Sequence, residues 1–340
     1  MKKKLSKIVG VALTLALLSS MVLAAAPVAA GDGIWTKTKV PASGAGKALT
    51  TGTIGALGQS IDGTLFAVDS LGTGNKDLYK STDGGRAWAA TGFNVAVTIT
   101  MIATSLSEAN VLYVSDGADV WKSDDTGATF VVMAELGETI TSIDATKLAD
   151  NYVVVAGTSS GTTDVWTFDE SVLFPTWVAQ EVGSGAGSVL AVAFSPNFAT
   201  DRAIVAVGSD ATDTIVTTKV GSGAFGATIK NVNLKSAGTT EIDSAQAASI
   251  AFPDDFDYLT NNIFLVGVTG DGSPAGDVYR VYGSKTTSVA LDRNIGGSGT
   301  DKQVHTVDVS GAASVANVVA GLTNGEGRYS TNGGTSFFKP

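Results

Sequence analysis

The sequence predicts an all-β fold built from a repeated unit of four antiparallel strands, and three observations predict it. An eight-residue pattern, Ser-x-Asp/Asn-x-Gly-x-small-aromatic, occurs three times in the 340 residues. The first two copies lie 42 residues apart, which matches one four-stranded repeat of about 40–45 residues. The composition is rich in Gly, Ala, Val, Thr, Ser and Asp, a balance that suits short strands joined by turns.

Each copy of the pattern has the chemistry of a tight turn. Ser and Asp or Asn side chains hydrogen-bond nearby backbone N–H groups, and Gly supplies the positive φ that the turn requires. The trailing aromatic begins the next strand. The turn residues are Ser81, Asp83, Gly85 and Trp88; Ser123, Asp125, Gly127 and Phe130; and Ser330, Asn332, Gly334 and Phe337. Because these side chains satisfy their own backbone, we expect a structural role for them and no ligand contact.

The pattern resembles the Asp-box, or BNR repeat, of sialidase-like β-propellers, and the composition is similar to that of exported bacterial surface-layer or cell-surface proteins. The resemblance implies a β-propeller whose Asp-boxes lie on the rim, away from the central pocket. We therefore predict six four-stranded antiparallel blades. The repeats span about 54–98, 99–139, 140–188, 189–246, 247–303 and 304–340. Seven blades is the alternative, because both Trp35 and Phe337 fit the outer strand of a blade.

Residues 1–30 have the pattern of a secretory signal peptide, which leaves the propeller in residues 31–340. Four lysines precede an apolar run from Ile8 to Leu23, and small residues follow at a cleavage site near Ala30. The apolar run is too short and wrongly flanked for a lasting membrane anchor. We expect an exported protein, extracellular or on the cell surface. Residues 34–40 after the signal predict an outer strand that pairs with the last blade.

The repeats differ in how well the turn pattern survives. Expected strands in the first three are 65–68 and 77–80, 111–114 and 120–122, and 152–157 and 164–167. The pattern is intact in the first two repeats, but in the third it has decayed to residues 167–170, with an insertion before Trp177. Strands 203–208 and 263–267 of the fourth and fifth repeats are continuous apolar runs, typical of strands buried on both faces. Each follows a Phe-rich segment, 193–198 or 251–256, and the sixth repeat recovers the pattern.

The charge balance limits the classes of partner. The formal net charge is −10, and removal of the signal, which holds four of the 22 Lys and Arg residues and no acid, makes it −14. This argues against nucleic acid, whose phosphates need clustered Lys and Arg. We expect a protein or a surface glycan as partner, or self-association in a lattice. The chain has no cysteine, so it forms no disulfide.

The chemistry of a sialidase is missing from the sequence. Such enzymes need an Arg cluster, a Tyr nucleophile with a Glu partner and an Arg-Ile-Pro motif, and no arginine here lies in such a motif. The arginines are Arg86, Arg202, Arg280, Arg293 and Arg328. A glycosidase with two carboxyl groups leaves no motif and stays open as an alternative. We therefore predict a protein without enzymatic activity and name no catalytic residue.

Two short motifs carry little weight. Residues 157–161 match Gly-x-Ser-x-Gly, but a hydrolase elbow is followed by a helix and a strand is expected here. A pairing of Ser159 with His305, the single histidine, is weaker than a surface or packing role for His305. Residues 221–226 match a dinucleotide fingerprint without its strand–helix unit, and we expect a turn.

Calcium is the one cofactor that the sequence suggests. Two acidic loops offer oxygen ligands, although without EF-hand spacing, and solvated turns are the alternative. The candidate ligands are Asp254, Asp255, Asp257, Asp271 and Asp277. With no cysteine and one histidine, zinc, iron and haem lack ligands.

The expected function is that of a non-enzymatic, exported cell-surface or surface-layer-type protein whose propeller is a structural, protein-binding or glycan-binding module. A secreted glycan-active hydrolase is one alternative. The other is an assembly factor, because Asp-box propellers resemble the photosystem II assembly proteins and sortilin-type receptors, both of which bind protein partners.

Overall fold

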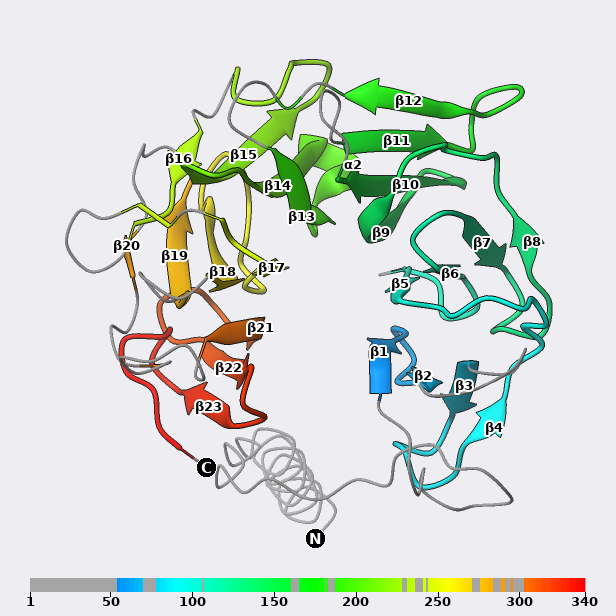
Figure 1. Ribbon diagram of the computed structural model, residues 1–340, viewed down its shortest axis with the longest axis horizontal. Helices are drawn as coiled ribbons and strands as arrows, with labels where there is room; N and C mark the ends of the chain where they lie inside the picture. Colours follow the sequence, from blue (N-terminus) through cyan, green and yellow to red (C-terminus); the bar gives the residue numbers. More distant parts are fainter. Residues whose placement is uncertain are drawn as a thin grey trace, which may run out of the picture. The chain divides into compact units, whose positions relative to one another are not determined.

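The computed structural model is an all-β protein whose six sheets are the blades of a β-propeller (Figure 1). It describes residues 54–69, 78–105, 107–159, 165–180, 182, 187–227, 231–235, 241–242, 244–270, 276–283, 289–290, 295 and 303–339. The prediction of an all-β propeller with six blades is therefore confirmed. The expected signal peptide and the expected strand 34–40 lie outside the described residues.

The strands follow one another along the chain, four to each of the first five blades and three to the sixth. The first three blades hold β1 (Ile54–Gln59), β2 (Leu65–Asp69), β3 (Leu78–Ser81) and β4 (Ala89–Ala90); β5 (Met101–Thr104), β6 (Leu112–Ser115), β7 (Val120–Ser123) and β8 (Val131–Val132); and β9 (Ile140–Leu148), β10 (Asn151–Thr158), β11 (Val165–Asp169) and β12 (Trp177–Gln180). The next three hold β13 (Ser188–Phe194), β14 (Ala203–Ser209), β15 (Thr214–Val220) and β16 (Val232–Asn233); β17 (Ala247–Ala251), β18 (Ile263–Thr269), β19 (Val278–Tyr282) and β20 (Val289–Ala290); and β21 (Val304–Ser310), β22 (Asn317–Leu322) and β23 (Gly327–Ser330).

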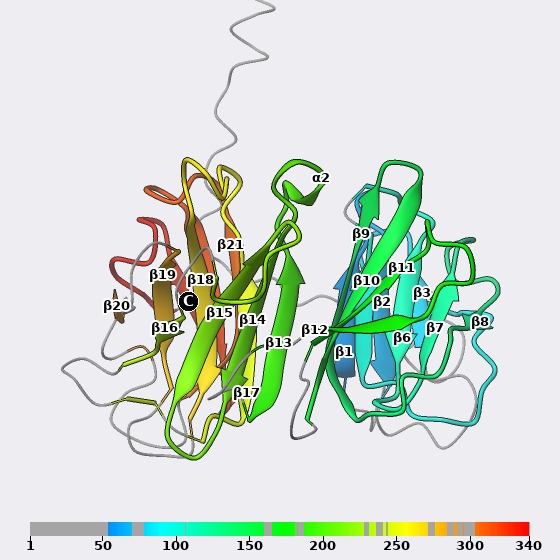
Figure 2. The same cartoon turned by 90° about the horizontal axis from the view of Figure 1, so that it is seen from above.

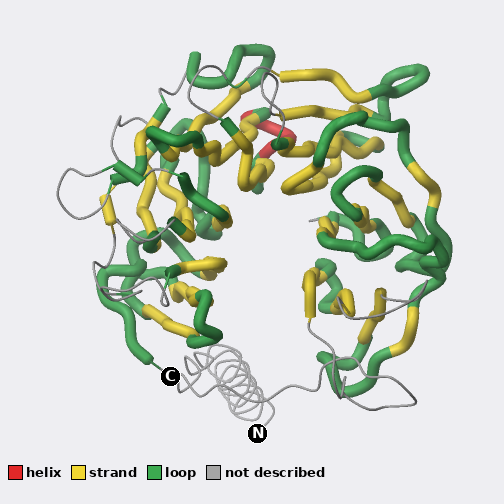
Figure 3. The backbone as a smooth tube through the Cα atoms, viewed as in Figure 1, coloured by secondary structure: helices red, strands yellow, loops and turns green. Residues whose placement is uncertain are grey.

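Every blade is an antiparallel meander in which strand order in the sheet equals order in the chain. The first strand of each blade lies toward the centre and the last at the rim, as the yellow strands in Figure 3 show. In the side view of Figure 2 the strands of neighbouring blades stand side by side with the twist usual for β-sheets. This arrangement places the β3–β4, β7–β8 and β11–β12 turns on the outer half of the blades.

The sixth blade ends in a short pairing at the position of a fourth strand. Tyr329 and Phe338 form an isolated antiparallel bridge, with N–H···O distances of 3.0 and 2.8 Å in the two directions. Their rings also pack, with centroids 5.8 Å apart. The residue after Phe337 thus takes the outer position of this blade.

Apolar clusters between neighbouring blades form the core. Phe66 and Val68 pack against Leu112 and Trp121 between blades 1 and 2, and similar clusters join blades 2 to 3, 3 to 4, 4 to 5 and 5 to 6. Each fully buried side chain of this size contributes about 1.5–3 kcal/mol to folding. Among the described residues, no such cluster joins blade 6 to blade 1.

Close packing between blades explains the glycine at the start of the Gly-x-Ser-x-Gly match. A Cβ atom on Gly157 would lie 2.7 Å from Val189 Cγ1 of the next blade, closer than carbon atoms approach. Ser159 follows the end of β10, and the next described element is the strand β11. Gly157 is therefore part of a blade junction.

The one helix among the described residues is α2 (Phe198–Asp201), a single turn between β13 and β14. No described helix is long and apolar enough to cross a membrane.

Candidate functional site

The three predicted turns have the same hydrogen-bonded geometry. In the second, the Ser123 hydroxyl donates to Asp125 Oδ1 at 2.9 Å and accepts from the Gly127 N–H at 2.9 Å. Asp125 Oδ1 also accepts the N–H groups of Ala128 and Thr129. The turn at Ser81 repeats all of these bonds. The turn at Ser330 repeats them except that the Thr335 N–H donates to the Asn332 carbonyl. The polar atoms are used within the turn.

These bonds also set the ionisation of the Asp side chains. The hydroxyl and N–H of Thr129, with Ser123 and Ala128, lower the pKa of Asp125 to about 2. The Ala87 N–H, with Ser81 and Arg86, lowers the pKa of Asp83 in the same way. Both carboxylates are therefore ionised at neutral pH and bound to their own loop, so they are poorly suited to accept or donate a proton for a substrate.

Blade 3 has a different structure where blades 1, 2 and 6 have this turn. Phe168, the cross-strand partner of Trp177, takes the place of the serine, and Asp169 Oδ1 accepts the Ser171 N–H at 2.8 Å. The tip that follows is Val172, Leu173 and Phe174, of which Leu173 is 82% exposed and Phe174 is 83% exposed. Phe174 has φ of +59°, a conformation that costs a non-glycine residue free energy. The insertion thus exposes three apolar side chains.

A polar network anchors the base of this tip to blade 2. Glu170 accepts a hydrogen bond from the Tyr113 hydroxyl at 2.9 Å and pairs with Lys122 Nζ at 2.6 Å. The Lys122 ammonium also lies 4.8 Å from the ring centroid of Tyr152. Burial, with the charge of Glu170, raises the pKa of Tyr113. A neutral, fully buried tyrosine does not act as a nucleophile, so this Tyr–Glu pair fixes the junction.

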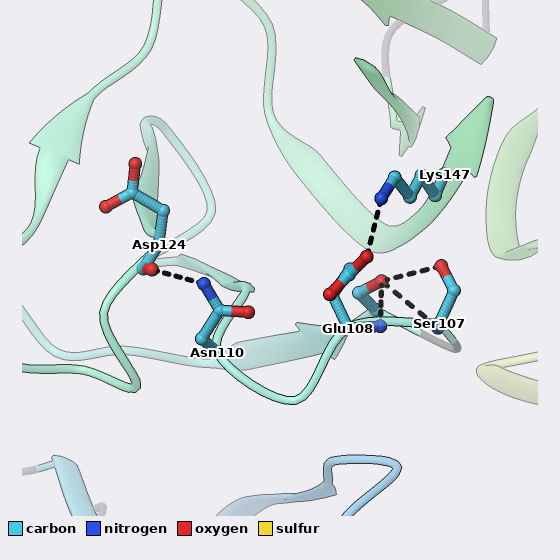
Figure 4. A network of polar contacts seen from close by, with 6 residues as sticks. Ser107, Glu108, Asn110, Asp124 and Lys147 are labelled. Carbon is cyan, nitrogen blue, oxygen red and sulfur yellow. Dashed lines mark hydrogen bonds and ion pairs between the residues drawn. The ribbon is translucent and has the colours of Figure 1, made fainter. Parts of the chain in front are cut away.

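A second group of polar contacts joins the loops of the same two blades (Figure 4). Lys147 on β9 pairs with Glu108 in the β5–β6 loop at 2.5 Å, and the Ser105 hydroxyl accepts the Glu108 N–H. Asn110 Nδ2 donates to the carbonyl of Asp124 at 2.6 Å. Both lysines of this region are thereby neutralised by carboxylates.

An open depression of about 400 Å³ lies at the junction of blades 2 and 3. It is lined by Gly117, Ala118 and Asp119 from the β6–β7 loop and by Glu135, Gly137, Glu138 and Thr139 from the β8–β9 connection. Within the described part of the chain, Asp119, Glu135 and Glu138 have no ion-pair partner. The depression therefore presents three unneutralised carboxylates to solvent.

The negative charge of the chain is concentrated in these blades. Residues 101–180 contain twelve Asp and Glu residues, two lysines and no arginine, so this segment alone carries a formal charge equal to the −10 of the whole chain. The candidate functional site is the outer part of blades 2 and 3, where the exposed tip and the acidic depression occur.

The candidate calcium ligands serve mainly as backbone acceptors. Asp254 Oδ2 and Asp255 Oδ1 accept the N–H groups of Gly311 and Ala313 in blade 6, at 3.0 and 2.8 Å. Asp257 and Asp277 accept N–H groups from their own loops, and Asp271 lies outside the described residues. No group of three or more His, Asp or Glu side chains within the described ranges has the arrangement of a metal site. Calcium binding stays a prediction.

The other chemical candidates are not brought together. Arg86, Arg202, Arg280 and Arg328 lie in blades 1, 4, 5 and 6, and Arg293 is outside the described residues. Ser159 and His305 belong to blades 3 and 6, which are not neighbours, and His305 is exposed on β21. Residues 221–226 connect β15 to β16 as a turn, with Gly221 and Gly226 at positive φ.

Sequence reasoning missed the Tyr113–Lys122–Glu170 network, the apolar tip and the acidic depression. The insertion before Trp177 was visible, and its three consecutive apolar residues in place of Asp and Gly were the signal for an exposed apolar surface. The network had no sequence signal, because its members come from two different strands and a loop of the next blade.

Comparison with known proteins supports the fold and leaves the family open. No protein-family profile matches the chain, and no curated protein sequence is similar to it. Among solved structures, the chain is similar to the WD40 repeats of RRP9, with a TM-score of 0.58, 12% identity and coverage of 89% of this chain and 85% of that one. It is also similar to YCF48 from Cyanidioschyzon merolae, with a TM-score of 0.57, 14% identity and coverage of 87% and 88%. YCF48 bound to a D1 peptide gives a TM-score of 0.55 at 14% identity, covering 89% and 88%. At such low identity, the structural similarity establishes the β-propeller fold and nothing about function.

Proposed function

We propose that this protein is an exported, non-enzymatic propeller of the Asp-box type that binds a protein partner at the cell surface. The observation that carries the proposal is the β11–β12 tip, where Leu173 and Phe174 are more than four-fifths exposed. Apolar side chains gathered on a surface favour protein contact, because water is released when a partner covers them.

The hydrogen bonds of the Asp-box side chains and of two acidic residues also support a binding role for the surface. The Asp-box side chains bond their own turns, and Asp254 and Asp255 bond the next blade. These groups hold the scaffold, so the exposed surface between blades is left as the place for binding. YCF48, a propeller of similar fold, has been solved with a D1 peptide bound, which is a precedent for peptide binding by this architecture.

The experiment has two parts. Cell fractionation followed by mass spectrometry of the surface layer is expected to find the protein in the cell-surface fraction without residues 1–30. Purified protein is expected to leave a panel of fluorogenic glycosides unhydrolysed. Hydrolysis that is lost on mutation of pocket acids such as Glu135 would replace this proposal by the glycan-active hydrolase, and a cytoplasmic protein would contradict the exported part.

A further inference from the structure

A strip of exposed apolar side chains follows the rim of blades 2 and 3. It consists of Val131, Val132, Val172, Leu173 and Phe174, and is called the rim strip below; Val131 is 70% and Val132 54% exposed. Figure 1 shows β8 and the β11–β12 connection on the same side of the rim.

A cross-strand pair and a salt bridge connect the two halves of the rim strip. Val131 is the cross-strand partner of Lys122, and Lys122 is paired with Glu170, two residues before Val172. The tip is therefore tied to β8 through a salt bridge whose two side chains are only about one-fifth exposed. A partner thus meets a prearranged surface and pays little ordering entropy on binding.

The rim strip leads into the acidic depression. The Met133 N–H, directly after Val132, bonds the carbonyl of Val120, which follows Asp119 of the depression. The Trp177 indole N–H bonds the carbonyl of Ala134 at 2.8 Å, beside Glu135. The apolar side chains of β8 therefore lie next to the segments that carry Asp119 and Glu135.

The negative charge of this region determines which kind of partner can bind to it. The two lysines of residues 101–180 are already paired, and Asp119, Glu135 and Glu138 face solvent without a cation. A positively charged partner is attracted to such a surface, and a second copy of this acidic chain is repelled. The edge strand β8 is two residues long and offers its outer side to an extended segment.

We propose that the rim strip and the acidic depression together bind an extended segment of a partner protein in which apolar residues alternate with lysine or arginine. The apolar side chains cover Val131, Leu173 and Phe174, and the cationic side chains enter the depression beside Glu135 and Glu138. This inference rests on the proposed function and adds the chemistry of the partner.

The test measures binding of a fluorescein-labelled peptide of alternating valine and lysine to the purified full chain by fluorescence anisotropy. Binding is expected to weaken with salt, because the charges are at the surface. The triple variant D119N/E135Q/E138Q is expected to bind about tenfold more weakly and to lose the salt dependence. The double variant L173S/F174S is also expected to bind about tenfold more weakly but to keep the salt dependence.

Matched controls come from other blades. L259S/V315S removes two exposed apolar side chains of blades 5 and 6, and D308N removes an exposed carboxylate of β21. Both are expected to bind the peptide as the unmodified protein does. A peptide with glutamate in place of lysine is expected not to bind.

Three results would overturn the inference. They are the absence of binding by the lysine peptide, equal binding by the glutamate peptide, and unchanged affinity of both D119N/E135Q/E138Q and L173S/F174S. Self-association that L173S/F174S abolishes in light scattering would assign the strip to a second copy instead. None of these results bears on the cell fractionation or on the glycoside panel. Failure of this inference is therefore distinct from failure of the proposed function.

Discussion

Blades 1, 2 and 6 keep the Ser-Asp/Asn-Gly turn, and blades 3 and 4 have lost it, yet all five pack in the same way. In the first group each turn satisfies its own polar atoms. In the second the trailing aromatic is what remains: Trp177 and Phe225 are both 8% exposed and belong to apolar clusters with a neighbouring blade. The aromatic anchors the outer part of the blade to its neighbour, and the polar side chains of the turn shape the connection.

Within one repeat, the buried aromatic therefore contributes to stability, and the connection before it determines the surface chemistry. The Ser and Asp or Asn side chains bond within their own turn, so their loss leaves the apolar cluster of the junction intact. Blade 3 shows the consequence, since its connection holds Leu173 and Phe174 in place of Asp and Gly while Trp177 stays buried. A propeller with such a division can vary its rim for binding without rebuilding its core.

The strongest test of the comparison is Trp177→Ala. We expect a loss of about 3–5 kcal/mol in the free energy of unfolding, because a buried ring in contact with Phe168 is replaced by a cavity. Denaturant unfolding followed by fluorescence measures it. The matched control is Phe174→Ala, three residues earlier and exposed, for which we expect a change within about 0.5 kcal/mol. Equal losses would show that the tip is part of the core.

The next largest effect concerns Asp144, an inner-strand residue of blade 3 that bonds the next blade. Its Oδ2 accepts the Phe194 N–H at 2.8 Å, and burial raises its pKa from the usual 3.8 to about 6, against the opposing effect of its N–H donors. The folded protein therefore holds this proton more tightly than the unfolded chain. Stability from this group is full below pH 3.8 and is lost as the pH rises through 6, by about 3 kcal/mol.

Asp144→Asn is expected to remove that fall, and urea unfolding between pH 4 and pH 7 measures it. Asn keeps an oxygen that accepts the Phe194 N–H but loses the acceptor of the Ala145 N–H, so the test is the change of stability with pH and not its absolute value. Asp150→Asn, an exposed residue of the same blade, serves as control. A variant whose stability still falls between pH 4 and pH 6 would assign the titration to another group.

A smaller effect is expected within the turns. Ser123→Ala leaves the buried Gly127 N–H without its acceptor and is expected to cost about 1–2 kcal/mol in urea unfolding. Ser171→Ala in the blade 3 tip is the control, with an expected change within about 0.5 kcal/mol, because Ser171 is exposed and only its backbone N–H is bonded. If both changes are neutral, the retained turns contribute nothing to stability and the comparison between blades fails.

The fold was predictable because its signals are local. The recurrence of Ser-x-Asp-x-Gly at 42 residues and the apolar runs near Val205 and Val266 need no long-range information. The turn hydrogen bonds were predicted correctly for the same reason. The count of six was confirmed by the six sheets, and Phe338 pairs with Tyr329 at the outer edge of the last one; Trp35, which the sequence left as a rival for that position, lies outside the described residues.

The candidate site was not predictable, because its parts are distant in the chain. Tyr113 and Glu170 are 57 residues apart, and Glu108 meets Lys147 across 39 residues. Asp254 and Asp255 looked like cation ligands because sequence alone does not show that Gly311 and Ala313 present N–H groups to them. Only the insertion before Trp177 was visible in advance.

The smallest expected effect is a pH dependence that distinguishes two of the retained turns. Asp125, with its pKa lowered to about 2, stabilises the fold above pH 3.8, and this contribution is lost as the pH falls through 2. The turn of blade 6 carries Asn332 at the same position; its Oδ1 accepts the Ser336 N–H at 3.1 Å and does not titrate.

We therefore expect Asp125→Asn to lower the melting temperature at pH 7 and to reduce its fall between pH 4 and pH 2. The reciprocal change, Asn332→Asp, is expected to raise the melting temperature at pH 7 and to steepen that fall, because a carboxylate accepts N–H groups more strongly than an amide oxygen does. Calorimetry at pH 2, 3, 4 and 7 measures both. Since each turn supplies the residue that the other lacks, opposite shifts would show that the ionised carboxylate itself stabilises the turn. Shifts of the same sign would mean that local packing differs between blades 2 and 6 and that the turn is not a transferable unit.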